Sequence, residues 1–295
     1  MKVLRYLIAS ILTGLVITTC GVLILGSVWK AWYVYLVLFL LPGMPNPANL
    51  MAWPWSAGIT HSMRWLLKIN LVVKNHTDLP RGRPVVLICN HPPAAFFPIL
   101  VWASMTNLRL LPVVVSKASN LWNALLAIVI FPSLVMKALM VTTRGNGWGA
   151  WLVEKLSRLM VTRWSMLIIF ADAHRPESKK ALADYERMVE VVPSIQYQDR
   201  LGAYHYAGVY SALKALGLNA SVVAATMSFP RGATGWKAPW RVYGETIAIR
   251  IRDVTHIFQS AMLEEVGEGG RPTKFIEAIN DLACDEDSWI ITRNR

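Results

Sequence analysis

An uncharged stretch of 24 residues near the amino terminus, Tyr6 to Trp29, constrains this chain more than any other feature. A helix needs about 20 predominantly apolar residues to cross a bilayer, so the stretch is long enough to be a membrane span. A cleaved signal peptide is the alternative, but the stretch exceeds the usual apolar core of about 7–15 residues and no A-x-A site follows it. A lipoprotein signal ending at Cys20 is disfavoured because Thr19 stands where such a signal has a small residue. Cations precede the span, which predicts a bacterial-type inner (cytoplasmic) membrane protein whose globular domain faces the cytoplasm.

The segment that follows is apolar but shorter. Ala31 to Leu41 contains 11 residues, which at about 1.5 Å per residue reach half-way through a bilayer and predict a re-entrant segment. We expect residues 1–45 to form the anchor with this re-entrant segment, and residues 46–75 to form an interfacial amphipathic segment. Tryptophan favours the headgroup region of a membrane, and five of the 13 tryptophans fall here: Trp29, Trp32, Trp53, Trp55 and Trp65. A buried helix of the globular domain is the alternative interpretation.

The composition narrows the class of partner. Hydrophobic residues make up 54% of the chain, charged residues only 16%, and the net charge is +12. A basic, apolar chain of this kind is more typical of a membrane-surface protein than of a nucleic-acid binder, which would need clustered cations on a water-soluble fold. Three widely spaced cysteines predict neither a disulfide framework nor a zinc site. We expect membrane lipids as partners, no nucleic acid, and no metal.

Residues 76–295 predict a single α/β domain. Short apolar stretches alternate with helical ones, which is typical of a mixed, largely parallel sheet flanked by helices. The expected strands are Pro84–Cys89, Ser165–Phe170, Ala220–Met227 and Thr246–Ile251. The expected helices are Leu121–Lys137, Trp148–Val161, Ser178–Val191 and Ala203–Leu216. The first of these helices is uncharged up to Met136, so a membrane-dipping segment is an alternative there.

Two polar motifs directly follow expected strands. Asn90 and His91 follow the first strand, and a neutral imidazole can take a proton from a hydroxyl group near pH 7. The sequence Phe-Ala-Asp-Ala-His-Arg, residues 170–175, ends the second strand, and Arg175 could clamp a phosphate through two hydrogen bonds. Taken singly, a histidine bonded within a turn and a solvated loop arginine are the alternatives.

Together these motifs resemble those of the lysophospholipid acyltransferase superfamily, the glycerolipid acyltransferases that esterify lysophosphatidic acid. Asn90 and His91 match the start of its N-H-x-x-x-x-D motif, and Arg144 loosely matches its arginine after an apolar segment. The third block of the family corresponds to Phe170, Asp172, Ala173, His174 and Arg175, and a later basic stretch weakly matches residues 198–200. The final strand-then-proline block resembles residues 226–230.

The resemblance implies a membrane-bound enzyme that moves a fatty acyl group from a thioester to the hydroxyl of a lysophospholipid-like acceptor. It implies His91 as the general base, and Arg144, Asp172, His174, Arg175 and Arg200 as acceptor-binding residues. Acyl-CoA or acyl carrier protein is the expected co-substrate, and no cofactor is required.

Phe96 stands where the family motif has its aspartate. That aspartate orients the histidine, and in a serine protease triad the loss of this function costs about 10⁴ in rate. A catalytically impaired homologue that binds lipid without turnover is therefore an alternative function, as is a membrane-anchored interaction protein. On the sequence alone, Phe96→Asp is expected to restore part of the activity.

Overall fold

A computed structural model describes residues 47–79, 82–92, 96–117, 139–142, 148–171, 179–196, 201, 204–229, 241–263 and 272–293. The expected anchor and re-entrant segment, residues 1–45, and the expected helix Leu121–Lys137 lie outside these ranges. Among the helices within them, none combines the length and the apolar character that a membrane span requires.

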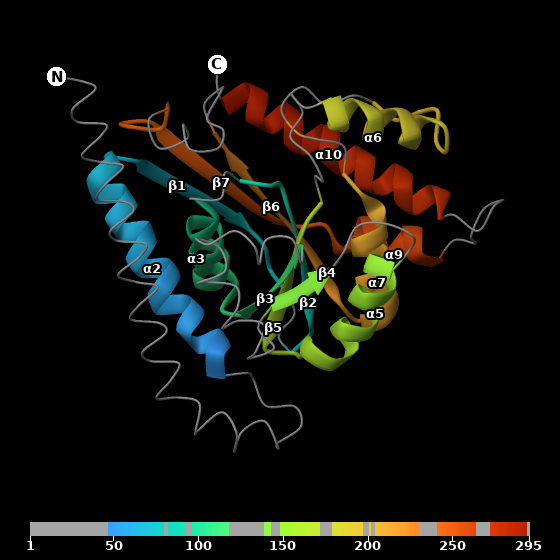
Figure 1. Ribbon diagram of the computed structural model, residues 1–295, viewed down its shortest axis with the longest axis horizontal. Helices are drawn as coiled ribbons and strands as arrows, with labels where there is room; N and C mark the ends of the chain where they lie inside the picture. Colours follow the sequence, from blue (N-terminus) through green and yellow to red (C-terminus); the bar gives the residue numbers. More distant parts are fainter. Residues whose placement is uncertain are drawn as a thin grey trace.

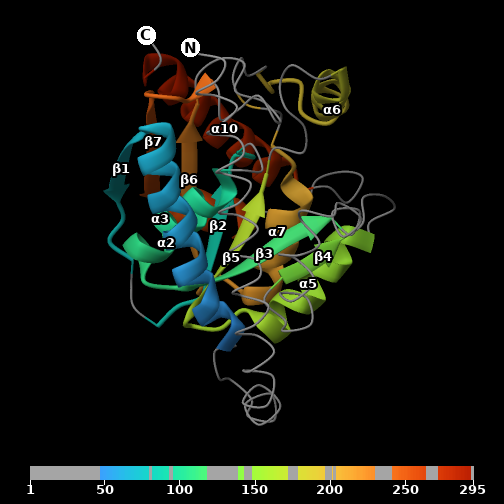
Figure 2. The same ribbon diagram turned by 60° about the vertical axis from the view of Figure 1, so that its left-hand side comes forward.

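A seven-stranded sheet forms the centre of the domain (Figures 1 and 2). Its strands are β1 (Asn70–His76), β2 (Val85–Cys89), β3 (Leu111–Lys117), β4 (Leu139–Thr142), β5 (Ser165–Phe170), β6 (Ser221–Ser228) and β7 (Thr246–Asp253). They are arranged in the order β1-β7-β6-β2-β5-β3-β4, and every neighbouring pair is parallel except β6 with β7. The expected mixed, largely parallel sheet is confirmed.

Helices cover both faces of this sheet and make a three-layer structure. One face carries α2 (Pro47–Leu67) and α3 (Phe97–Leu108). The other carries α5 (Trp148–Met160), α7 (Tyr206–Leu216), α9 (Thr255–Leu263) and α10 (Thr273–Arg293). Helix α6 (Lys179–Val189) packs against α10 through Met188 and Ile276. Figure 1 shows α2 and α3 on the left of the sheet and α5, α7 and α9 on the right.

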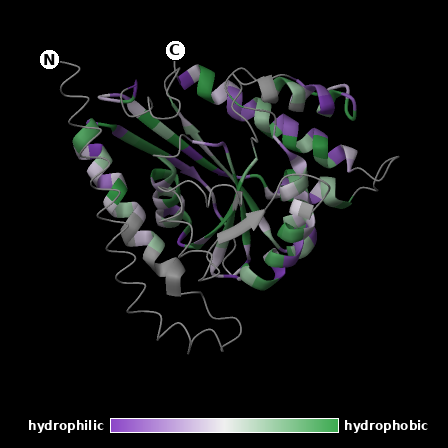
Figure 3. Cartoon of the chain, in the orientation of Figure 1, coloured by the Kyte–Doolittle hydropathy of each residue, from purple (hydrophilic) through white to green (hydrophobic). Residues whose placement is uncertain are grey.

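The strand β2 shows why the sheet must be covered on both sides. All five of its residues are buried. Val86 and Ile88 contribute to the core beneath α5 and α7, whereas Val85, Leu87 and Cys89 contribute to the core beneath α3. Because successive side chains of a strand point to opposite faces, a continuous apolar strand needs a layer on each face. The buried strands are accordingly green in the hydropathy view, while the helices mix both colours (Figure 3).

The four expected strands and the three expected helices within the described ranges are present, each with bounds shifted by at most a few residues. Strands β1, β3 and β4 and helices α3, α9 and α10 were not predicted. β4 has only four residues, the second half of β1 is polar and exposed, and α10 carries charged residues along its length.

Residues 47–75, which fall within the segment expected at the interface, pack into the domain. Ile59, Met63 and Leu67 form a stripe on α2 that is buried in the domain core, and β1 pairs with β7 along its whole length. These residues therefore contribute to the core and the sheet of the α/β domain. Of the five tryptophans that suggested an interface, the structure describes the side chains of Trp53 and Trp65, and both are exposed. Whether this outer face contacts a membrane stays a prediction.

Candidate active site

The candidate base, His91, lies at the point where the buried strand β2 ends. β2 is paired in parallel with β5 on one side and β6 on the other, so the carboxyl ends of all three strands meet at one edge of the sheet. The imidazole is exposed, although the three residues before it in the chain are buried. This placement at the carboxyl edge is where open α/β sheets bind their ligands.

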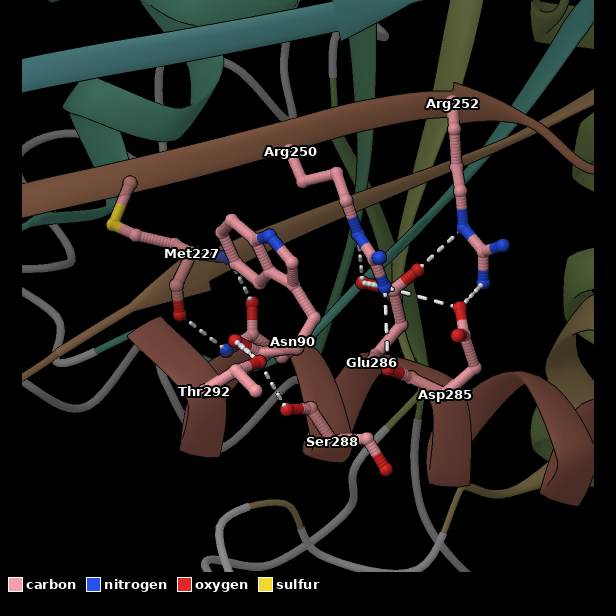
Figure 4. Close-up of polar contacts among 9 residues, drawn as sticks. Asn90, Met227, Arg250, Arg252, Asp285, Glu286, Ser288 and Thr292 are labelled. Atoms are coloured by element: carbon pink, nitrogen blue, oxygen red, sulfur yellow. Dashed lines mark hydrogen bonds and ion pairs between the residues drawn. The ribbon is translucent and has the colours of Figure 1, made fainter. Parts of the chain in front are cut away.

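Asn90 fixes the chain directly before the histidine. Its side-chain amide nitrogen donates to the Met227 carbonyl oxygen at 2.9 Å, and the Met227 N–H donates to the Asn90 Oδ1 at 2.8 Å (Figure 4). Asn90 is 5% exposed, so both hydrogen bonds are shielded from water. The side chain thus continues the pairing of β2 with β6 beyond the last residue of the strand, and it holds the backbone from which His91 projects.

A backbone carbonyl orients the imidazole. The His91 Nδ1 lies 3.0 Å from the carbonyl oxygen of Pro92. A carbonyl can only accept, so Nδ1 carries the proton in this contact, and in the neutral ring Nε2 is then the nitrogen that can accept one. The aromatic neighbour of the ring is Phe170, whose centroid is 5.1 Å away at an interplanar angle of 39°. The contact thus leaves Nε2 as the unprotonated ring nitrogen.

Phe96, which replaces the family aspartate, is part of the apolar core. Its side chain is 0% exposed and packs edge-on against Phe229, with 5.4 Å between ring centroids. It sits at the amino end of α3, in the core that α2 and α3 share with the sheet. Phe96 therefore fills a packing position, and the aromatic ring in contact with His91 comes from β5 instead.

The other candidate residues, Arg144, Asp172, His174, Arg175 and Arg200, lie outside the described residues. The structure does describe the strands that precede two of these segments, β5 before Asp172 and β4 before Arg144. Ala171 donates its N–H to the Cys89 carbonyl at 3.0 Å, so the chain leaves β5 beside the start of the Asn90–His91 turn. β4 also ends at this edge, three strands from β2, or about 14 Å at the usual strand spacing.

Three contacts in this region were not predicted from the sequence: those made by the Met227 peptide, the Pro92 carbonyl and the Phe170 ring, although Phe170 and Met227 belong to the motif blocks named above. The first two act through backbone atoms, which every residue has, so no residue pattern marks them. His205 was also not singled out, although its N–H donates to the Ala171 carbonyl at 2.8 Å and brings the start of α7 to the same edge. No sequence pattern marks this half-buried histidine, and only the three-dimensional structure shows that it lies near this edge.

Comparison with known proteins supports the fold. No protein-family model matches the chain, and no curated protein matches it at a significant level. Among solved structures, the chain is similar to the 1-acyl-sn-glycerophosphate (LPA) acyltransferase PlsC from Thermotoga maritima. The two share a TM-score of 0.54 and 14% sequence identity, over 97% of this chain and 98% of that chain. At this identity, the similarity establishes a shared fold over nearly the full length.

Proposed function

We propose that this protein is an acyltransferase that moves a fatty acyl group from a thioester to the hydroxyl of a lysophospholipid-like acceptor. The observation that carries the proposal is the position of His91, exposed at the carboxyl end of a buried parallel strand. The full-length similarity of fold to an LPA acyltransferase supports the same reaction class. The proposed setting is the inner face of a bacterial cytoplasmic membrane.

In the proposed reaction, the His91 Nε2 accepts the proton of the acceptor hydroxyl. The alkoxide oxygen attacks the thioester carbonyl carbon and forms a tetrahedral oxyanion. Collapse of this intermediate breaks the carbon–sulfur bond, and the imidazolium returns its proton to the departing thiolate. The products are an ester and a free thiol, with no net oxidation or reduction. The Pro92 carbonyl supports this role for His91, because it favours the tautomer with an unprotonated Nε2.

The acceptor phosphate is proposed to bind near the ends of β4 and β5. Arg144 follows the end of β4 by two residues and Arg175 follows β5 by five, and both strands end at the edge that bears His91. A guanidinium can hold a phosphate through two charge-assisted hydrogen bonds. Asp172, His174 and Arg200 are proposed as further acceptor-binding residues because they match, more loosely, the motifs of the lysophospholipid acyltransferases.

A catalytically impaired lipid-binding protein is the second candidate function, and the position of Phe96 favours it. A carboxylate in a His–Asp dyad also stabilises the imidazolium as it forms, which a neutral carbonyl does less well. With Phe96 in the core against Phe229, no carboxylate occupies the motif position. We therefore expect slow turnover rather than none.

Transfer of labelled acyl groups from acyl-CoA to a panel of lysophospholipids and monoacylglycerol tests the proposal. The purified full-length chain should acylate at least one phosphate-bearing acceptor. Replacing Arg175 or Arg144 with Ala should weaken the binding of phosphate-bearing acceptors by about ten- to a hundred-fold, because a charge-assisted hydrogen bond is worth about 1.5–3 kcal/mol. Binding of monoacylglycerol, which has no phosphate, should be unchanged. Lipid binding without transfer in the wild type would favour the impaired homologue.

A further inference from the structure

Three aromatic rings form a row that runs from the first turn of α3 to the candidate base. Phe97 begins α3, and its ring packs edge-on against Phe170, with 5.7 Å between centroids at an interplanar angle of 66°. Phe170 ends β5, and its ring centroid lies 5.1 Å from that of the His91 imidazole. Phe97 and Phe170 are half-buried, whereas the neighbouring Phe96 is fully buried and packs against Phe229. The row therefore connects the helix that follows position 96 to the exposed imidazole.

The Phe170 ring is held in place by the fold itself. Phe170 pairs with Cys89 in the parallel ladder of β5 and β2, and both side chains contribute to the core beneath α3. Directly after it, Ala171 donates its N–H to the Cys89 carbonyl at 3.0 Å. Phe97, which packs against the ring, is fixed by a helix whose next residues, 98–100, are buried. A group held in this way can stabilise a charge without first reorganising.

A ring in this position can act on the charge that His91 acquires when Nε2 accepts a proton. In the family motif an aspartate would stabilise that imidazolium, but position 96 is an apolar phenylalanine here. The face of an aromatic ring carries partial negative charge and attracts a cation within about 6 Å of its centroid. The 5.1 Å between Phe170 and His91 falls within this range, and the two rings are inclined by 39° rather than perpendicular. The attraction is weaker than that of a carboxylate, and it arises only once the imidazole is charged.

The strands and the helix that meet at this point bring no formal charge to the imidazole. β2, β5, β6 and α3 contain a single ionisable side chain, the buried thiol of Cys89. The ionisable residues next to these elements in the chain are Asp172 and His174 after β5, and His205 before α7. Of these, the Asp172 carboxylate is the alternative source of a stabilising charge, so the test below includes it.

We propose that Phe170 is a positioning residue of the base: its ring orients the His91 imidazole and stabilises the imidazolium that forms during acyl transfer. Phe97 supports this role by packing against the ring from α3. The inference rests on the proposed function and deepens it, because it assigns to an aromatic pair part of the role that the family motif gives to an aspartate. Since a ring attracts a cation more weakly than a carboxylate does, the assignment also agrees with slow turnover rather than none.

Titration of the His91 imidazole by NMR tests the contact and needs no turnover. The full-length chain carries labelled histidine in detergent micelles, and the His91 resonance is the one that is absent from His91→Ala. Phe170→Leu removes the ring and keeps an apolar side chain. Its titration midpoint should move to lower pH by about 0.5, because the charged form loses an attraction of ordinary cation–π strength. Phe170→Tyr keeps a ring and should titrate like the wild type.

Kinetics of transfer from acyl-CoA to lysophosphatidic acid test the role in the reaction. Phe170→Leu should lower kcat about three- to tenfold and leave KM within about twofold of the wild type, because the ring acts on a charge that forms only in the reaction. Phe97→Leu should lower kcat less, since the Phe170 ring remains. The matched control is Tyr210→Leu, which removes a half-buried ring that packs edge-on against Phe275 at 5.2 Å. It should keep the kcat and the titration of the wild type.

Three results would overturn the inference: an unchanged His91 titration in Phe170→Leu, a loss in Phe170→Tyr as large as in Phe170→Leu, or equal losses in Phe170→Leu and the Tyr210→Leu control. The first result, together with a lower midpoint in Asp172→Asn, would assign the stabilisation to that carboxylate. Failure of the proposed function is distinguishable from failure of the inference. A midpoint that moves in Phe170→Leu, in a protein whose wild type transfers no acyl group, would support the ring contact and contradict the reaction.

Discussion

Two polar regions lie on the same sheet, one at the carboxyl end of β2 and one between β7 and α10. They differ in how far their polar groups are exposed and paired. At the end of β2, the His91 imidazole is exposed and its orientation is set by a neutral carbonyl. Between β7 and α10, charged groups are paired with one another and one of them, Glu286, is only 1% exposed.

The β7–α10 cluster is saturated by its own members (Figure 4). Arg250 lies 2.8 Å from one carboxylate oxygen of Glu286, and Arg252 lies 2.7 Å from the other. Both arginines also contact Asp285, and Arg250 stacks over Trp289 at 5.0 Å. Every oxygen of the buried carboxylate is thus engaged, and the cluster holds the last helix to the sheet.

The comparison separates stabilising polar groups from reactive ones. A buried charge with all its partners within the protein has no capacity left for a ligand. An exposed imidazole held at a strand end by its neighbours can still exchange a proton with a substrate. Asn90 belongs with the first kind, although it is adjacent to His91, because its amide is buried and bonded on both sides to Met227. Substitutions that distinguish the two kinds follow, in order of their expected effect on stability.

Phe96→Asp should have the largest effect on the free energy of unfolding. Loss of a fully buried aromatic side chain costs about 3–5 kcal/mol, and an unpaired carboxylate in its place adds several more. We expect the variant to be unfolded or inactive, which reverses the partial restoration expected from the sequence. Urea denaturation and acyl transfer check this, with Phe96→Leu as the control that keeps an apolar side chain. A folded and more active Phe96→Asp would show that this side chain can turn to His91.

Glu286→Ala should come next, with a loss of about 3–5 kcal/mol, because it leaves two arginines without their buried partner. The neighbouring Asp285 has a side chain that is 51% exposed, so Asp285→Ala should cost about 1 kcal/mol or less. Chemical denaturation of the two variants side by side measures the difference. Equal losses would mean that burial of the carboxylate does not govern its contribution.

Asn90→Ala should lower the free energy of unfolding by about 2–3 kcal/mol, because it leaves the buried N–H and the buried carbonyl of Met227 without their hydrogen-bond partners. Asn90→Asp keeps the acceptor for the Met227 N–H but loses the donor, so it should be intermediate near neutral pH. Asn70→Ala, at an exposed asparagine, is the matched control and should fall within about 0.5 kcal/mol of the wild type. An Asn90→Ala variant as stable as this control would show that the hydrogen bonds of Asn90 do not stabilise the fold.

The sequence was sufficient for the parts of the fold that depend on strong local patterns. β2, β5 and β6 are continuous apolar stretches, and their burial on both faces follows from that composition. β1 and β4 were missed for physical reasons: β1 is an edge strand with a largely exposed, polar second half, and β4 has only four residues. Such strands are defined by the neighbour they pair with rather than by their own residues.

The candidate site was predictable to the level of the histidine and no further. A histidine after a buried strand can be recognised in a sequence, because the strand itself can. The contacts that orient it cannot, because the Pro92 carbonyl and the Met227 peptide are backbone groups. The role of position 96 also depends on packing: only the core around Phe229 shows that this residue has a structural function.

His91→Ala tests the central claim most directly, with stability and acyl transfer measured on the same preparation of the full-length chain. The side chain is exposed, so its removal should change the free energy of unfolding by no more than about 0.5 kcal/mol. Transfer from acyl-CoA to lysophosphatidic acid should fall at least about a hundredfold, the lower range for loss of a general base. Wild-type transfer rates in a fully folded His91→Ala variant would contradict the assignment of His91 as the base.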